Sequence, residues 1–84
     1  MKIIINRRFA KNLVDIRTKH KLSQYKLVEK MQLLGSTMSR STYSKIELGA
    51  GNIKVSDLIA LKHIYDIEYD EFFEGISVDE KENE

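Results

Sequence analysis

Apolar residues recur along this chain at the spacing of amphipathic helices, and short polar segments separate the groups. Phe9, Leu13 and Ile16 follow one another at i, i+4 and i+7, which predicts a helix over about residues 7–20. Asn6 precedes this helix and has a side chain suited to cap its first turn. The first predicted element is therefore a helix with one buried stripe.

A second predicted helix starts after Ser23, which is also a residue type that caps helix N-termini. Its apolar stripe consists of Tyr25, Leu27, Val28, Met31 and Leu34. Gly35 suits the left-handed conformation that ends many helices. We therefore place the end of this helix directly before Gly35.

A third predicted helix covers about residues 40–48, between Ser39 as its N-cap and Gly49 as its end. Tyr43 and Ile46 are its inward-facing side chains. Most of the remaining positions are polar or charged, so this helix has a narrow apolar side and a wide polar one.

Two further helices complete the pattern, one from Val55 or Ser56 to about residue 66 and a short one over about residues 69–74. Their apolar side chains are Leu58, Ile59, Leu61, Ile64, Tyr65, Phe72 and Phe73. Sustained alternation at period two is absent, and only Lys2–Ile5 allows an extended segment. The pattern thus predicts an all-α fold of five helices.

These elements divide the chain into an N-terminal arm (1–6), a helical domain (7–75) and an acidic C-terminal tail (76–84). The chain has no cysteine, and His20 and His63 lie far apart, so we expect neither a disulfide nor a metal site. No apolar run reaches the roughly 18 residues of a membrane span. Polar residues interrupt the first apolar group at once, so we expect no signal peptide and a cytoplasmic protein.

The net charge of +1 conceals a strong asymmetry between the two halves of the chain. Residues 1–45 contain eleven lysines and arginines against two acids, a net charge of +9. Residues 46–84 contain three against eleven, a net charge of −8. This division favours a surface for a polyanion in the first half. The alternative is that the two halves only attract each other.

Leu13–Arg17, Leu22–Met31 and Met38–Gly49 resemble, in this order, the first, second and recognition helices of the phage-repressor and Cro family, the XRE-type transcriptional regulators. Residues 58–73 are similar to the last two helices of that family. The resemblance implies a five-helix, lambda-repressor-like helix-turn-helix fold. It also implies double-stranded DNA as the partner.

The chain departs from the family pattern at two positions. Gln32–Thr37 lengthens the turn between the second and third helices. Because Leu34 continues the apolar stripe, we expect the second helix to gain about one turn, with the loop starting at Gly35. Val28 is the second departure, since the family favours a small alanine where these two helices cross.

In this family the third helix enters the major groove, and its first residues and one residue a turn later reach base edges. By position, the resemblance assigns base contacts to Arg40, Ser41, Ser44 and Lys45. It assigns contacts with backbone phosphates to Gln24, Lys26 and Thr42. An ordinary solvated helix face is the alternative interpretation of Arg40 and Lys45.

Arg17 and Glu47 match a pair that resembles an internal salt bridge of the family, between the first helix and the end of the third. Tyr43, Ile46, Tyr65, Phe72 and Phe73 are interpreted as core. So small a core leaves little room for a small-molecule ligand. No spacing of Ser, His and Asp suggests catalysis, so we expect no enzyme activity and no cofactor.

The sequence therefore predicts a transcriptional regulator that binds a palindromic operator as a homodimer. The alternative is a protein-interaction module, such as an antitoxin or a regulatory partner domain with the same fold. For the dimer interface, the last two helices and Phe72–Val78 are the first candidate. In one alternative to this interface, Ile76 and Val78 fold back on their own subunit. In another, Ile3–Ile5 pairs with the same segment of the second subunit through backbone hydrogen bonds.

Overall fold

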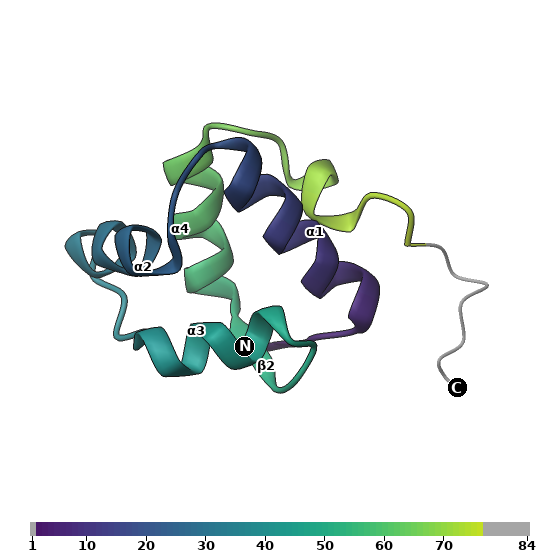
Figure 1. Ribbon diagram of the computed structural model, residues 1–84, viewed down its shortest axis with the longest axis horizontal. Helices are drawn as coiled ribbons and strands as arrows, with labels where there is room; N and C mark the ends of the chain where they lie inside the picture. The colour runs from purple at the N-terminus through teal and green to yellow at the C-terminus, as the bar shows by residue number, and fades with distance from the viewer. Residues whose placement is uncertain (1, 77–84) are drawn as a thin grey trace.

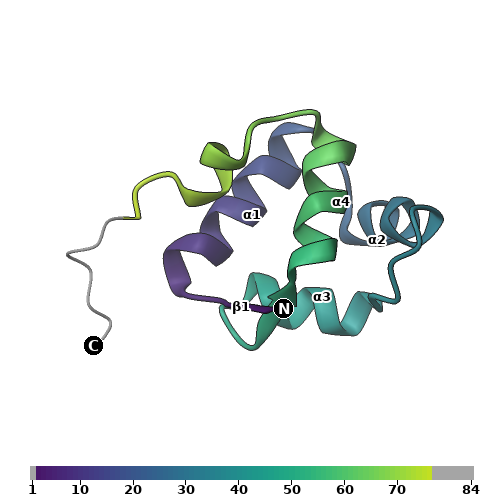
Figure 2. The same ribbon diagram turned by 180° about the vertical axis from the view of Figure 1, so that it is seen from behind.

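The computed structural model describes residues 2–76, which form four α-helices, a short antiparallel strand pair and a 3-10 helix (Figures 1 and 2). In chain order the elements are β1 (Lys2–Ile4), α1 (Arg7–Lys19), α2 (Gln24–Leu33), α3 (Arg40–Glu47), β2 (Asn52–Lys54), α4 (Val55–Tyr65) and the 3-10 helix η1 (Tyr69–Phe73). The first four predicted helices are confirmed, with ends close to the predicted positions.

Three helices begin at the capping side chains that the sequence indicated. In each, the side-chain oxygen accepts a hydrogen bond from the backbone amide three residues later, at 2.7 Å for Asn6, 3.0 Å for Ser23 and 3.2 Å for Ser39. Each bond satisfies an amide that has no partner within its own helix. The caps therefore determine where α1, α2 and α3 start.

A single core lies where the four α-helices meet. Its largest fully buried side chains are Leu13, Leu27, Met31, Tyr43, Ile46, Ile53, Leu61 and Phe72. Residues from α1, α2, α3, β2, α4 and η1 all contribute to this set, so no element is stable through its own contacts alone.

Four apolar side chains that we assigned to the buried stripes or the core are exposed: Tyr25 by 62%, Leu34 by 49%, Ile59 by 51% and Phe73 by 39%. Leu34 is the C-cap of α2 and has left the helical stripe. Ile59 and Phe73 each directly follow a buried residue, and neighbouring residues in a helix point in different directions. Tyr25 lies in the first turn of α2 and faces outward.

The long turn between α2 and α3 is held by side-chain hydrogen bonds with α2 and α4. Gly35 has a φ of 98°, the left-handed conformation predicted for it. Ser36 Oγ donates to Oδ1 of the buried Asp57 on α4 at 2.8 Å and accepts from the Met38 amide at 2.9 Å. Gln32 Nε2 donates to the Met38 carbonyl at 2.8 Å. These bonds position the start of α3.

The pairing of β1 with β2 corrects the all-α prediction. The antiparallel register is Lys2 with Lys54, Ile3 with Ile53 and Ile4 with Asn52. Ile53 is buried, as is Ile5 directly after β1, so the pair adds apolar side chains to the core. We allowed extended structure at Lys2–Ile5 but missed β2, because three residues are too few to show an alternating pattern.

The short fifth helix predicted over about residues 69–74 forms as a 3-10 helix, Tyr69–Phe73, so the structure has four α-helices and not five. Asp66 adopts a left-handed φ of 55° and ends α4. The buried Asn12 of α1 then donates through Nδ2 to the carbonyls of Phe72 and Glu74, both at 2.9 Å. These bonds satisfy two carbonyls at the end of η1 and attach the segment to α1.

Candidate nucleic-acid interface

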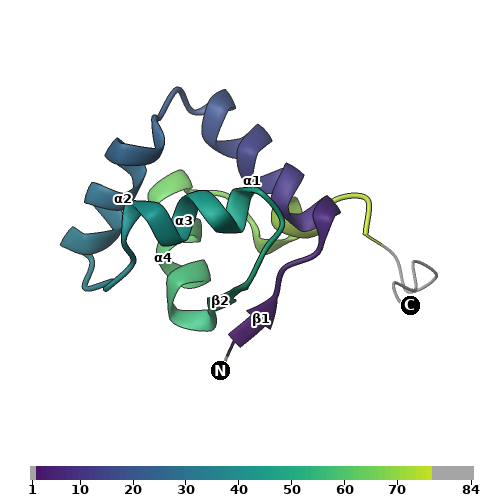
Figure 3. The ribbon, with the colours of Figure 1, turned by 60° about the horizontal axis from the view of Figure 1, so that its bottom comes forward.

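α3 lies at the surface of the fold, in front of α4 (Figure 3). Its buried side chains place its apolar side on the core, and its polar side faces solvent. Tyr43 and Ile46 are buried. The exposed residues of α3 are Arg40, Ser41, Thr42 and Lys45, and Ser44 is half-buried. The structure therefore brings the four residues predicted to contact bases onto one side of α3, with Ser44 at its margin.

The positive charges of α3 are left without acidic partners. Among the described residues, neither Arg40 nor Lys45 takes part in an ion pair, whereas Lys26 pairs with Glu29, Lys11 with Asp15 and Lys19 with Glu71. The acidic η1 lies against α1, away from α3 (Figure 1). Attraction between the two halves of the chain thus engages α1 and leaves the charge of α3 available to an external anion.

Arg40 also belongs to a surface shared with α2. It lines a recess of about 180 Å³ together with Tyr25, Val28, Glu29 and Gln32. The exposed Tyr25, predicted to belong to the apolar stripe of α2, is thus part of the surface around Arg40. α2 and the start of α3 form one continuous exposed surface.

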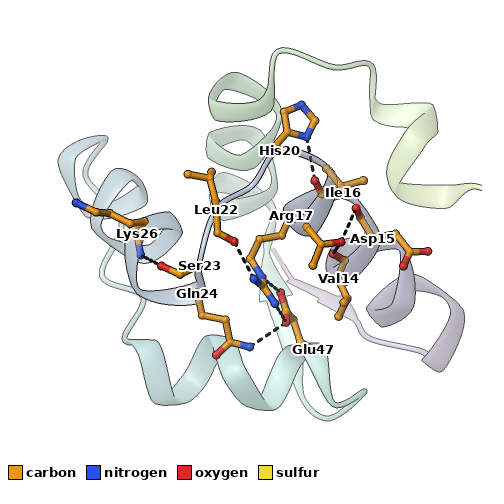
Figure 4. Close-up of polar contacts among 11 residues, drawn as sticks. Val14, Asp15, Ile16, Arg17, His20, Leu22, Ser23, Gln24, Lys26 and Glu47 are labelled. Atoms are coloured by element: carbon orange, nitrogen blue, oxygen red, sulfur yellow. Dashed lines mark hydrogen bonds and ion pairs between the residues drawn. The ribbon is translucent and has the colours of Figure 1, made fainter.

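Arg17, Glu47 and Gln24 form a hydrogen-bonded network that joins α1, α2 and α3 (Figure 4). Arg17 Nε lies 2.7 Å from Glu47 Oε2, and Arg17 Nη2 lies 2.9 Å from Glu47 Oε1, so the pair is bidentate. Arg17 Nη1 also donates to the Leu22 carbonyl at 2.8 Å. The pair that we assigned to structure therefore links α1 to the end of α3 and to the segment before α2.

Burial and hydrogen bonding act in opposite directions on the Glu47 carboxyl. The side chains of Arg17 and Glu47 are only 14% and 5% exposed, and desolvation alone would raise the pKa of Glu47. The hydrogen bonds that its carboxylate accepts, that of Arg17 first, outweigh this effect and hold the pKa of Glu47 below its ordinary value. The same bond raises the pKa of Arg17, so both groups stay charged.

Gln24 has a contact that the sequence did not predict. Its Nε2 donates to Glu47 Oε1 at 2.9 Å, and the side chain is half-buried at the start of α2. An amide group carries two N–H donors and one oxygen, so one bond leaves the others available. The contact with Glu47 fixes Gln24 relative to α3. Lys26 and Thr42, the other residues expected at phosphates, are exposed.

The two histidines occupy unrelated positions. The His20 ring lies 4.8 Å from the Tyr65 ring between centroids, and His63 is exposed on α4. Within residues 2–76, no group of three His, Asp or Glu side chains is placed to hold a metal ion. In the same part of the chain, no helix is long and apolar enough to cross a membrane.

The chain matches a known protein family over most of its length. Residues 13–72, from α1 into η1, match the family model described as helix-turn-helix. The matched range includes Arg17, Gln24, Glu47 and all of α3, whereas β1 lies outside it. No curated protein matches the chain, and neither does any solved structure.

Proposed function

Because the chain belongs to the helix-turn-helix family, whose members bind DNA, we propose that it is a transcriptional regulator that reads a specific duplex sequence with α3 in the major groove. The observation that supports this most is the outer side of α3, where Arg40 and Lys45 are exposed and make no ion pair with any described residue. A major groove about 12 Å wide admits a helix with such a side.

Each exposed residue of α3 has a role in this proposal. Arg40 donates a bidentate pair of hydrogen bonds to O6 and N7 of a guanine, and Ser41, Ser44 and Lys45 contact neighbouring bases. Gln24, Lys26 and Thr42 contact phosphates and so set the orientation of α3 in the groove. The first amides of α2 favour a phosphate at the same position.

We predict that the DNA affinity falls steeply as salt is added, because lysines and arginines displace counterions condensed on the duplex. For about three to five phosphate contacts per subunit, the slope of log affinity against log salt is roughly −3 to −5 per subunit. Raising the salt from about 50 to 200 mM then weakens each subunit by about 60- to 1,000-fold. Fluorescence anisotropy on labelled duplexes measures this slope.

Selection of bound sequences from a random duplex library supplies the specific site for that measurement. A protein that binds no duplex at about 50 mM salt, where the counterion effect favours binding, contradicts the proposal. In that case the alternative function, an interaction module for another protein, takes its place. Affinity that does not change with salt leads to the same conclusion.

We further propose that the protein binds as a homodimer, since one such domain contacts few bases and two half-sites supply useful affinity. Within the C-terminal candidate interface, Phe72 is buried in its own core and Ile76 packs against that core. Val78 lies outside the described residues. Ile59, Tyr69 and Phe73 remain exposed on α4 and η1 and are the apolar side chains available there.

Replacing Ile59 with glutamate is expected to convert the dimer to a monomer, because a charge then lies in an apolar contact. Leu33, which is 83% exposed on α2, serves as the matched control, and Leu33→Glu should leave the dimer intact. Sedimentation velocity of both variants and of a form ending at Gly75 makes the comparison. A native chain that stays monomeric at high concentration and binds DNA without cooperativity contradicts the dimer.

A further inference from the structure

A second recess lies beside α3, next to the paired strands. It has a volume of about 210 Å³, and its lining includes Lys2, Thr37, Thr42, Asn52, Lys54 and Asp57. Thr42 faces this recess, whereas Arg40 faces the recess shared with α2. The strands and α2 therefore flank α3 on different sides (Figure 3).

Two lysines face each other across the strand pair at the edge of this recess. Lys2 and Lys54 are direct partners in the register of β1 and β2, so their side chains leave the same face of the pair. Both are exposed, and neither forms an ion pair with a described residue. Like charges directly opposite each other destabilise a strand pair, and an anion bound between them removes that repulsion.

The rest of the lining adds hydroxyl and amide donors. Lys54 Nζ lies 3.4 Å from Thr37 Oγ1, so this lysine is directed toward the recess. Thr42 and Asn52 are exposed there and have side chains that can donate to a phosphate oxygen. One carboxylate, Asp57, belongs to the lining, but it is 5% exposed and already accepts the Ser36 hydroxyl. The accessible charge of the recess is positive.

We infer that this recess binds a backbone phosphate of the DNA strand opposite the strand that the start of α2 contacts. The inference rests on the proposed function. A helix in the major groove has one sugar-phosphate backbone on each side, and α2 with Gln24 and Lys26 lies on one side of α3. The recess at Lys2 and Lys54 lies on the other. The β-strand β1, which precedes the matched helix-turn-helix range, thereby becomes part of the DNA interface.

The double variant Lys2→Gln/Lys54→Gln tests this inference against a control with the same loss of charge. The control is Lys19→Gln/Lys21→Gln, which changes two exposed lysines, one in the last turn of α1 and one just after it, neither of which lines the recess. Losing the contact with this phosphate should reduce the magnitude of the salt slope by about 1 per subunit, and equally on selected and random duplexes. The control should keep the slope of the native protein to within about 0.5. The melting temperature of the test variant should stay equal or rise, because the repulsion across the strands is gone.

Neutral methylphosphonate linkages, introduced one at a time into the selected duplex, identify the strand. In the native protein, a neutral linkage at the phosphate bound by the recess should lower the affinity. A second linkage, at the phosphate bound by Lys26, should lower the affinity of the native protein but not that of the Lys26→Gln variant. These two linkages should lie on opposite DNA strands. The Lys2→Gln/Lys54→Gln variant should be insensitive to the linkage at the phosphate bound by the recess. A variant with the native slope, or a sensitive linkage on the same strand as that of Lys26, overturns the inference while the DNA-binding proposal stands. A native protein that binds no duplex at about 50 mM salt overturns both.

Discussion

Replacing Arg17 with methionine is expected to lower the free energy of unfolding by about 3–5 kcal/mol, the largest loss that we anticipate from a single substitution outside the apolar core. The reason is the position of Glu47, whose side chain is 5% exposed and whose carboxylate accepts two hydrogen bonds from Arg17. Without Arg17, this buried carboxylate loses both of those hydrogen bonds and keeps the one that it accepts from the Gln24 amide. Urea denaturation followed by circular dichroism measures the loss.

The double variant Arg17→Met/Glu47→Leu distinguishes two contributions to this loss. One is the cost of an unpaired buried carboxylate, and the other is the net stability that the ion pair contributes. Replacing both partners with apolar residues often restores stability, so most of the loss should be recovered. Lys11→Met provides the control, because Lys11 forms an exposed pair with Asp15 that is worth about 0.5 kcal/mol or less. A loss for Arg17→Met as small as that for Lys11→Met contradicts the structural role of the network.

The same network gives the stability of the fold a dependence on pH. Because the pKa of Glu47 is lowered in the folded protein, its contribution is complete above the unfolded carboxyl pKa, at about 4.3. The contribution is lost as the pH falls through the lower pKa of the folded state. The native protein should therefore lose more stability than the double variant on acidification below about pH 4.

Replacing Arg40 with alanine should weaken binding to the selected site by about 1–3 kcal/mol, or roughly 5- to 150-fold, and relax the preference at one base pair. Arg40 lies at the first position of α3, is exposed and has no ion pair among the described residues, so the substitution should leave the fold intact. Binding of the variant to duplexes carrying each base at each position of the site locates the affected base pair.

Lys26→Ala is the companion variant for this measurement. Lys26 is expected to contact a phosphate, so the variant should lose nearly the same affinity for the selected site as for scrambled DNA. Gln24→Ala should behave alike on DNA, but it also removes a hydrogen bond to Glu47, so its stability must be measured beside its affinity. If Arg40→Ala weakens both kinds of duplex equally, Arg40 contacts a phosphate and the assignment to a base is wrong.

What the sequence predicted well is local. Asn6, Ser23 and Ser39 cap their helices, and Gly35 is left-handed, because each of these outcomes depends on a few neighbouring residues. The pair of Arg17 and Glu47 came from a family resemblance and not from spacing. The residues on the outer side of α3 followed from the apolar positions Tyr43 and Ile46.

What the sequence did not predict depends on distant contacts. β2 exists because β1 pairs with it, and their partners are about fifty residues apart in the chain. The last predicted helix is a 3-10 helix whose final carbonyls accept hydrogen bonds from Asn12 of α1, sixty residues earlier in the chain. No pattern within one segment contains this information.

The bond from Asn12 to the carbonyls of Phe72 and Glu74 has a consequence for the order of folding. It closes a loop of sixty residues or more, and the β1–β2 pair closes one almost as long. Contacts so distant along the chain incur a larger closure entropy than those between consecutive helices, and contacts of this kind slow folding. We therefore expect the α2–α3–α4 unit to assemble first and the two terminal segments to join it last. By that stage, the α2–α3 surface is already formed.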